Sequence, residues 1–282
     1  MTTAAEFLDV AGIADDDDPN QSANDAILAR LKRVLTEDWD THPRSLQRAI
    51  GPSEIGHPCA RQIAAKVTGV PAVNPGGDPL PAWLGTAGHA KLEDAFNSDN
   101  ARVLEHAQNH PGTEARTTTD PITGEEVGPW ITERRLEIAP GLSGTCDLYS
   151  RLSGTVVDHK FVGASAASKY RKFGPPEHYR VQAHLYGLGY RNAGYRVERV
   201  AIWFIPRASF LSKAWVWSEP FDASIAEAAI DRLEKIRTAV EALNARENHE
   251  ALSLVPATES GCRFCPFFSA APVEGVWSCQ GR

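Results

Sequence analysis

The sequence predicts an α/β fold with a mixed central sheet flanked by helices. Its first hundred residues hold apolar side chains at helical spacing, whereas from Trp130 onward apolar side chains alternate as they do in strands. Further along the chain, helix patterns and strand patterns take turns. A strand meander followed by alternating helices and strands is typical of a sheet with both parallel and antiparallel neighbours.

The N-terminal part is expected to contain a leader and three helices. Residues 1–20 carry six acids and no base, which predicts a disordered acidic leader. A first helix is expected at 22–37. A second, at 53–69, begins with a serine that can cap it. After a loop rich in proline and glycine, at 70–81, a third helix is expected at 82–97.

The remainder is expected to form the sheet and the helices that cover it. A turn-rich segment, 109–129, precedes the strand meander. The expected strands are 130–138, 142–149, 155–162, 197–205 and 214–217. Helices are expected at 175–192 and 222–248, the second of them amphipathic. The tail, 256–282, carries three cysteines and has little regular pattern.

The composition excludes two classes of protein. With 282 residues, 42% of them apolar and 23% charged, the chain has ordinary globular composition. No apolar run approaches the roughly 18 residues that a membrane span needs, so no transmembrane helix is expected. The N-terminus lacks a basic start followed by an apolar stretch, so no secretory signal is expected. These observations indicate a cytoplasmic protein.

Charge is unevenly distributed along the chain. The net charge of −7 argues at first against a polyanionic partner. Residues 151–216, however, hold eleven lysines and arginines against three acids. This basic segment is compatible with binding a phosphate backbone, and a merely solvated surface is an equally good interpretation of the charge alone.

Two neighbouring strands carry a set of residues that could bind a metal ion and take part in catalysis. Asp158 and Lys160 are two apart on a strand and share a face, whereas His159 points the other way. If the preceding strand pairs with this one as a hairpin, Asp147 lies beside Asp158. Two such carboxylates repel each other unless a divalent cation sits between them. A lysine beside that cation can polarise an attacking water.

Two helices carry residues that can complete this set. His89 and Glu93 are one turn apart in the expected third helix, and His89 can supply a further metal ligand. Gln182 and Tyr186, also one turn apart, can make polar and stacking contacts with a nucleic-acid strand. Each element alone has a common structural explanation, such as a surface ion pair or a core histidine. Their combination in this order is much more specific.

The ordered set resembles the PD-(D/E)xK nuclease superfamily, in particular its RecB-like exonuclease branch. The resemblance is carried by Gly85-Thr86-Ala87-Gly88-His89 with Glu93, by Gly144 to Asp147, by Asp158-His159-Lys160, and by Gln182 to Tyr186. It implies a restriction-endonuclease-like core in a single domain, residues 21–282.

For the site, the resemblance implies a divalent-metal nuclease. Mg²⁺ or Mn²⁺ would be bound by His89, Asp147, Asp158 and the backbone carbonyl of His159. Lys160 would assist the attacking water, and Gln182 and Tyr186 would position DNA. Glu133, one strand earlier, matches a position that is commonly acidic.

Four of the five cysteines form a second constellation. Cys262 and Cys265 make a CxxC motif, Cys279 follows, and Cys59 lies about 200 residues upstream. Four thiolates can bind a four-iron cluster or tetrahedral zinc, and a redox dithiol is the weaker alternative. Cys146 is next to Asp147 on a strand, so it should face the opposite side and pack in the core.

The cysteine layout resembles that of the iron–sulfur exonucleases, among them the CRISPR-adaptation nuclease family. His57-Pro58-Cys59-Ala60-Arg61 is similar to their first-ligand motif, although here the proline precedes the cysteine. The resemblance implies a structural 4Fe–4S cluster that joins the helical segment 53–98 to the tail. Ligand identity alone leaves zinc as the alternative.

Sequence and resemblance together predict a metal-dependent DNA exonuclease that acts on single-stranded ends. Arg171, Lys172 and Arg180 would bind the DNA backbone. The family implies recombination, DNA processing, or a CRISPR-like or bacteriophage context in a bacterial cell, with homo-oligomerisation or recombination and CRISPR partners. Two other classes stay open. One is a nucleic-acid-binding scaffold with an inactive site and a structural four-cysteine metal centre, and the other is an iron–sulfur electron carrier.

Overall fold

The computed structural model describes residues 19–43, 49–74, 78–111, 116–258 and 261–281. The chain divides into two compact units, 1–47 and 48–282. The described part of the first unit contains α2 (Pro19–Thr41), which spans the helix expected at 22–37. Residues 1–18 of the expected leader lie outside the described residues, and the last two begin α2. None of the described helices has the length and apolar character that a bilayer-spanning helix requires.

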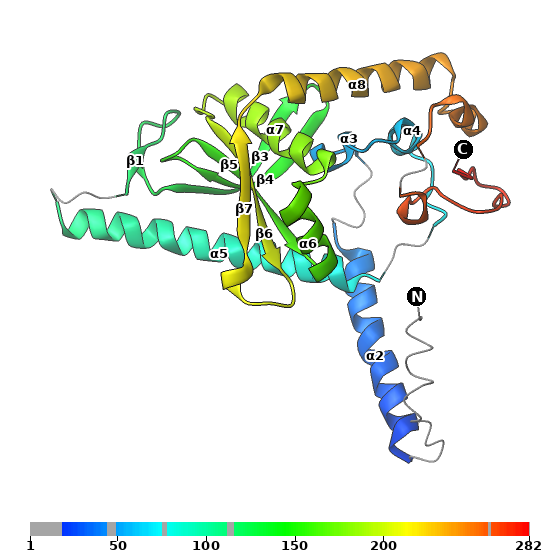
Figure 1. The fold of residues 1–282 in the computed structure, drawn as a ribbon, viewed down its shortest axis with the longest axis horizontal. Coiled ribbons are helices and arrows are strands. Elements are labelled where there is room, and N and C mark those ends of the chain that lie inside the picture. The colour runs from blue at the N-terminus through cyan, green and yellow to red at the C-terminus, as the bar shows by residue number, and fades with distance from the viewer. Residues whose placement is uncertain (1–18, 44–48, 75–77, 112–115, 259–260, 282) are drawn as a thin grey trace. The chain divides into compact units, whose positions relative to one another are not determined.

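The second unit is built on a five-stranded mixed sheet, which confirms the predicted sheet type (Figure 1). In spatial order its strands are β3 (Trp130–Ala139), β4 (Leu142–Ser150), β5 (Thr155–Val162), β6 (Arg199–Pro206) and β7 (Trp215–Pro220). β3, β4 and β5 form an antiparallel meander, β5 and β6 are parallel, and β7 is antiparallel to β6. The parallel pair needs a crossover, which α6 (Ala164–Phe173) and α7 (Glu177–Asn192) provide.

Helices cover both faces of this sheet. α7 packs on one face, and α8 (Ala223–Ala242) packs against α7 (Figure 1). The other face is covered by α5 (Leu80–Asn109). Successive side chains of β5 point to opposite faces of the sheet. Lys160 therefore contacts Gln182 of α7, whereas the ring of His159 stacks on Phe96 of α5.

The helix expected at 53–69 consists of two helices, α3 (Pro52–Ile55) and α4 (Ala60–Thr68). Pro58 explains the break, because proline has no backbone N–H and disfavours helical backbone at the residue before it. The expected end is confirmed: Gly69 follows α4 with a φ of 78°, a left-handed conformation that suits glycine.

Four further regions differ from the expectation. α5 continues to Asn109, beyond the expected end at 97, because no breaker interrupts it. α8 ends at Ala242, and residues His249–Leu254 form the short helix η2. The turn-rich segment contains a two-stranded sheet of β1 (Thr118–Thr119) and β2 (Glu126–Val127). α6 was not predicted; its ten residues mix alanines with lysines and arginine, and none of them is fully buried.

The core lies between the sheet and the helices α3, α4, α7 and α8, and the tail joins it. Phe267 and Trp277 of the tail are buried in this core. The backbone N–H of Arg61 donates to the carbonyl of Pro256, and those of Val73 and Asn74 donate to the carbonyl of Pro266. These bonds hold the tail against α4 and the loop that follows it.

Candidate active site

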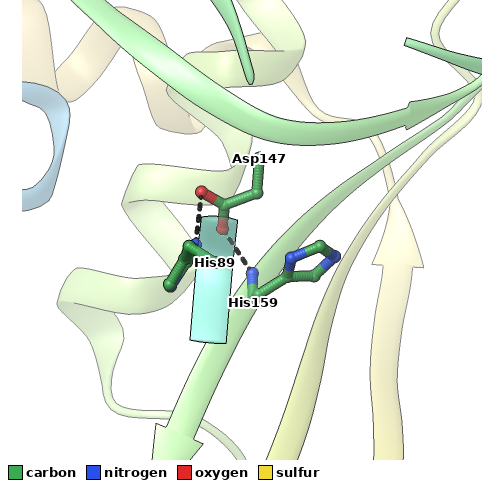
Figure 2. Close-up of side chains that lie close together, drawn as sticks. All are labelled: His89, Asp147 and His159. Carbon is green, nitrogen blue, oxygen red and sulfur yellow. Dashed lines mark hydrogen bonds and ion pairs between the residues drawn. The ribbon is translucent and has the colours of Figure 1, made fainter. Parts of the chain in front are cut away.

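Four elements bring their predicted site residues to one place. Regular pairing of β4 with β5 ends at Leu148 and Val157, just before Asp147 and Asp158. His89 reaches this point from α5, with its Nδ1 3.2 Å from Asp147 Oδ1. The other oxygen of Asp147 accepts a 2.6 Å hydrogen bond from the backbone N–H of His159. Figure 2 shows these two contacts on opposite oxygens of one carboxylate.

Two glycines allow this close approach. Gly88, next to His89, lies directly on Phe161 of β5, and a Cβ at this position would overlap the phenyl ring. α5 can therefore approach the sheet only with glycine here. Gly144 likewise lets α3 and α7 approach β4 closely, because a Cβ there would lie 2.7 Å from Pro52 and 3.1 Å from the ring of Tyr186. One glycine in each sequence motif, Gly88 and Gly144, thus has a packing role.

Glu133 lies opposite Asp147 in the register, between the pairs Thr132–Leu148 and Arg134–Cys146. Its φ of 40° is left-handed, a strained conformation for a residue with a side chain, at a cost of about 1–3 kcal/mol. Glu133 Oε1 lies 3.9 Å from His89 Nδ1. The strained backbone thus holds a second carboxylate beside His89.

Asp158 and Lys160 form a buried ion pair on the α7 side of β5. Lys160 Nζ lies 2.6 Å from Asp158 Oδ2 and donates to Gln182 Oε1 at 3.1 Å. It also lies 4.8 Å from the centroid of the Tyr179 ring. Lys160 is thus held by a carboxylate, an amide and an aromatic face, which fixes the direction of its ammonium group.

The pKa values of Asp147 and Asp158 are shifted in opposite directions. Burial raises the pKa of Asp158 to about 6; the Lys160 charge opposes this and the Asp147 charge adds to it. Burial would also raise the pKa of Asp147, but the hydrogen bond and charge of His89, with the charge of Lys160, lower it below its usual value. Burial opposes the charge of Lys160, yet Asp158 and Asp147 raise its pKa. At neutral pH the cluster therefore presents two carboxylates and one ammonium.

The donor atoms present fit a divalent cation. One ligand atom each from His89, Asp147 and His159 lies within 4.8 Å of the others. Burial lowers the pKa of His159 to about 4, so its ring is neutral at pH 7, and neither ring nitrogen has a hydrogen-bond partner. The carboxylate oxygens suit Mg²⁺ or Mn²⁺, and the imidazole nitrogens are ligands typical of transition-metal ions. The backbone carbonyl of His159 as a metal ligand stays a prediction.

Gln182 and Tyr186 lie beneath the site rather than on its surface. Both are 5% exposed, and Gln182 contacts Lys160. Their expected contacts with DNA stay a prediction; in this conformation the Tyr186 ring offers no open face for stacking. Tyr179 was missed by the sequence reasoning, although its position three residues before Gln182 puts it on the same helix face.

Among the expected backbone-binding residues, Arg180 is already paired. Its Nε lies 2.6 Å from Glu219 Oε1, and its Nη1 lies 3.4 Å from Glu177 Oε1. Arg171 donates to the carbonyl of Lys213 and stacks on Trp215. Lys172 is exposed on α6, 5.0 Å from the ring of Phe173.

The four cysteines expected to share a metal centre line one small pocket: Cys59, Cys262, Cys265 and Cys279. Cys59 caps α4, and the others come from the tail, so the pocket joins the two ends of the second unit. Cys279 Sγ accepts from the backbone N–H of Gly281 at 3.4 Å and lies 3.6 Å from Arg61 Nη1. Such N–H donors suit an anionic sulfur ligand. Cys146 is fully buried in the core.

Comparison with known proteins gives no family assignment. No family model and no curated protein matches the chain. Among solved structures, the alkaline exonuclease LHK-Exo from Laribacter hongkongensis is 9% identical with a TM-score of 0.39, and the match covers 78% of this chain and 100% of that one. SSO0001 is 17% identical with a TM-score of 0.41, and the match covers 86% of this chain and 94% of that one. A phage-related exonuclease from Haemophilus somnus 129PT is 12% identical with a TM-score of 0.33, and the match covers 54% of this chain and 74% of that one. Likenesses at these identities and TM-scores say nothing about what this chain binds or cleaves.

Proposed function

We propose that this chain is a divalent-metal-dependent deoxyribonuclease that hydrolyses phosphodiester bonds as an exonuclease. Two contacts at the end of the β4–β5 pairing carry the proposal, His89 with Asp147 and Lys160 with Asp158. The His89–Asp147–His159 ligand group does not include Asp158, whose charge nevertheless interacts with those of Asp147 and His89. Carboxylates, imidazole and a fixed ammonium are the groups that phosphodiester hydrolysis needs around its reacting phosphate.

The residues divide this work between them. His89, Asp147 and Asp158 would hold Mg²⁺ or Mn²⁺, which supplies Lewis acidity at the phosphate and a more acidic water. Asp147 keeps its orientation through the N–H of His159, and Glu133 adds negative charge beside His89. Lys160, directed by Asp158 and Gln182, orients the water and offsets the negative charge that develops on the phosphate oxygens.

The proposed substrate is DNA, with single-stranded ends preferred, in recombination or related DNA processing in a bacterial or bacteriophage setting. The motif resemblance supports this part of the proposal. The cysteine pocket would hold a structural 4Fe–4S cluster, with zinc as the alternative. The shared pocket of four thiols, two of them in a CxxC motif, supports a metal centre there.

The test uses purified protein and end-labelled linear DNA, single-stranded and duplex, with Mn²⁺, Mg²⁺ or a chelator. Nucleotide release is expected with the metals and not with the chelator. Asp158→Asn and Lys160→Gln should each lower the rate by roughly 100-fold or more. Asp231→Asn and Lys235→Gln, on the exposed side of α8, are matched controls that should keep the full rate.

Two outcomes contradict the proposal. A closed circular single strand offers no end, so its rapid degradation would contradict exonuclease action. Tight DNA binding without cleavage in any divalent metal would instead favour the scaffold with an inactive site.

A further inference from the structure

α6 and the segment 207–216, which contains the short helix η1 (Leu211–Lys213), form one basic surface. They carry five bases and no acid, and the bases are Lys169, Arg171, Lys172, Arg207 and Lys213. Arg171 joins the two segments through its hydrogen bond to the Lys213 carbonyl and its stacking on Trp215. In the part of the chain that the structure describes, none of the five lies within 4.0 Å of a carboxylate. We call this the α6–η1 surface.

The same surface exposes large apolar side chains. Phe173 is 71% exposed and Phe210 is 79% exposed, and Leu211 is comparably open to solvent. The opposite face of α6 is the one that packs on the core, through Ala166, Ala167 and Tyr170. Burying a phenyl ring stabilises a protein by roughly 1.5–3 kcal/mol, so two rings left in solvent beside unpaired cations indicate a surface that binds something.

The α6–η1 surface adjoins the proposed active site. β5 ends at Val162 and α6 begins at Ala164, four residues after Lys160. Tyr170 of α6 packs edge-on against Tyr179, with ring centroids 6.0 Å apart, and Tyr179 in turn contacts Lys160. A polymer bound along α6, about 15 Å long, would therefore continue to the reacting phosphate.

The mixture of rings and cations selects the chemistry of the occupant. Cations alone would suit any polyanion, including duplex DNA or an anionic lipid surface. Exposed rings gain from contact only where bases are unstacked and free, as they are in a single strand. In a duplex the faces of the bases are covered by their neighbours, so Phe173 and Phe210 would gain little from contact with it.

We propose that the α6–η1 surface is a binding track for single-stranded DNA, on which Phe173 and Phe210 stack bases and Lys169, Lys172 and Lys213 bind phosphates. This proposal rests on the proposed nuclease function, because it assumes that the bound strand continues from α6 to the proposed active site. Arg171 acts as a positioning residue that keeps α6 and η1 together.

The test measures binding separately from cleavage, by fluorescence anisotropy of a labelled oligothymidylate of about 20 nucleotides in the presence of a chelator. The double variant Phe173→Ala with Phe210→Ala should weaken binding of the single strand by tenfold or more and leave duplex binding unchanged. Leu254→Ala, an equally exposed apolar residue on η2, is the matched control. Circular dichroism checks that each variant is folded.

A second variant tests the phosphate contacts. Replacing Lys169, Lys172 and Lys213 together by glutamine should reduce the slope of log K against log salt by about 2, because each single-strand phosphate contact contributes about 0.7. Lys235→Gln should keep the slope. Single-strand affinity that is the same in the ring variant and in the unmodified chain overturns the track, as does an equal loss for duplex and single strand.

Failure of the track and failure of the nuclease proposal are distinguishable. If the unmodified chain cleaves DNA and the ring variant binds normally, the track is wrong and the nuclease stands. If binding depends on the rings but no metal supports cleavage, the nuclease is wrong and the surface stands as a strand-binding site. Sedimentation with phosphatidylserine vesicles adds one further outcome: vesicle binding lost in the lysine variant, with DNA binding retained, assigns the surface to lipid and overturns the track.

Discussion

The backbone N–H of His159 donates to Asp147 Oδ2 over 2.6 Å, at the point where the β4–β5 ladder ends. A strand donor that would otherwise face a carbonyl is thus satisfied by a carboxylate. The other oxygen of the same carboxylate faces His89. The end of regular pairing therefore both opens the site and orients its first acid, so small changes in backbone position there should have large effects.

The contact of Gly88 with Phe161 gives a first prediction. Gly88→Ala should lower the free energy of unfolding by about 1–3 kcal/mol, because the added methyl group overlaps the ring. It should also weaken Mn²⁺ binding, because α5 would carry His89 away from Asp147. Urea unfolding and titration calorimetry measure the two effects. Gly85→Ala is the control: its Cβ meets nothing within 4 Å, so about 0.5–1 kcal/mol of stabilisation is expected.

The left-handed backbone of Glu133 predicts that replacing this residue by glycine increases stability and decreases activity. Glu133→Gly should raise the free energy of unfolding by about 1 kcal/mol, since glycine adopts a φ of 40° without strain. Metal-dependent cleavage should fall, because the carboxylate beside His89 is lost. Glu137→Gly, at an exposed position of the same strand, should instead destabilise by about 0.5–1 kcal/mol. Equal destabilisation by both changes would refute the strain argument.

Gln182 should act on catalysis through Lys160. Gln182→Met keeps the volume and removes the oxygen that accepts from Lys160 Nζ. The pKa of Lys160, which its acidic neighbours raise, should then fall. We expect kcat to decrease by about tenfold, and the basic limb of the pH–rate profile to move to lower pH. A decrease in kcat with an unshifted basic limb would point to a structural role instead.

Asp120 should make stability depend on acid pH. Burial would raise the pKa of Asp120, but hydrogen bonds from the backbone of Ile122 and Thr123 and from Tyr195 lower it below its usual value. Because its pKa is depressed in the folded state, its stabilisation is complete above the unfolded value of about 4 and is lost as the pH falls through the folded value. The midpoint of urea unfolding is measured from pH 7 to pH 3 in steps of about one pH unit. It should decline less steeply for Asp120→Asn than for the unmodified chain. Asp231→Asn should leave the decline unchanged.

The cysteine pocket predicts a metal that can be removed. Cys279→Ser should lower both the metal content of protein purified without oxygen and its melting temperature, since the tail would lose its link to α4. Visible absorption with iron and sulfide analysis identifies an iron–sulfur cluster, and zinc analysis identifies the alternative. Cys146→Ser places a hydroxyl in the core, so it should lower stability while the metal content stays the same. Full metal content in Cys279→Ser would argue against a four-cysteine centre.

Strand alternation was sufficient to predict much of the site. It put Asp158 and Lys160 on one face and His159 on the other, and the contacts with α7 and α5 confirm this. The hairpin of β4 and β5 confirms that Asp147 is brought to β5. Patterns of period 2 and 3.6 carry this information because burial is decided locally by face.

Other features depend on tertiary contacts that no local pattern encodes. The left-handed conformation of Glu133 arises opposite Asp147, 14 residues away in sequence. The burial of Tyr186 on α7 depends on its contact with Gly144 of β4. α6 has no fully buried residue and packs on the core mainly through two alanines and Tyr170, so its core-facing side is difficult to recognise from the sequence. The pairing of Arg180 with Glu219 likewise joins residues from two separate elements.

The pocket shared by Cys59 and Cys279 also constrains the order of events during synthesis. Their codons are 220 apart, so a ribosome adding about 5–20 residues per second needs roughly 10 to 40 s to travel from one to the other. For most of that interval Cys59 has no partner cysteine from the tail, because Cys262 and Cys265 are added only shortly before Cys279. A centre that uses all four cysteines can therefore assemble only after Cys279 has been added, when every strand of the central sheet has already been synthesised.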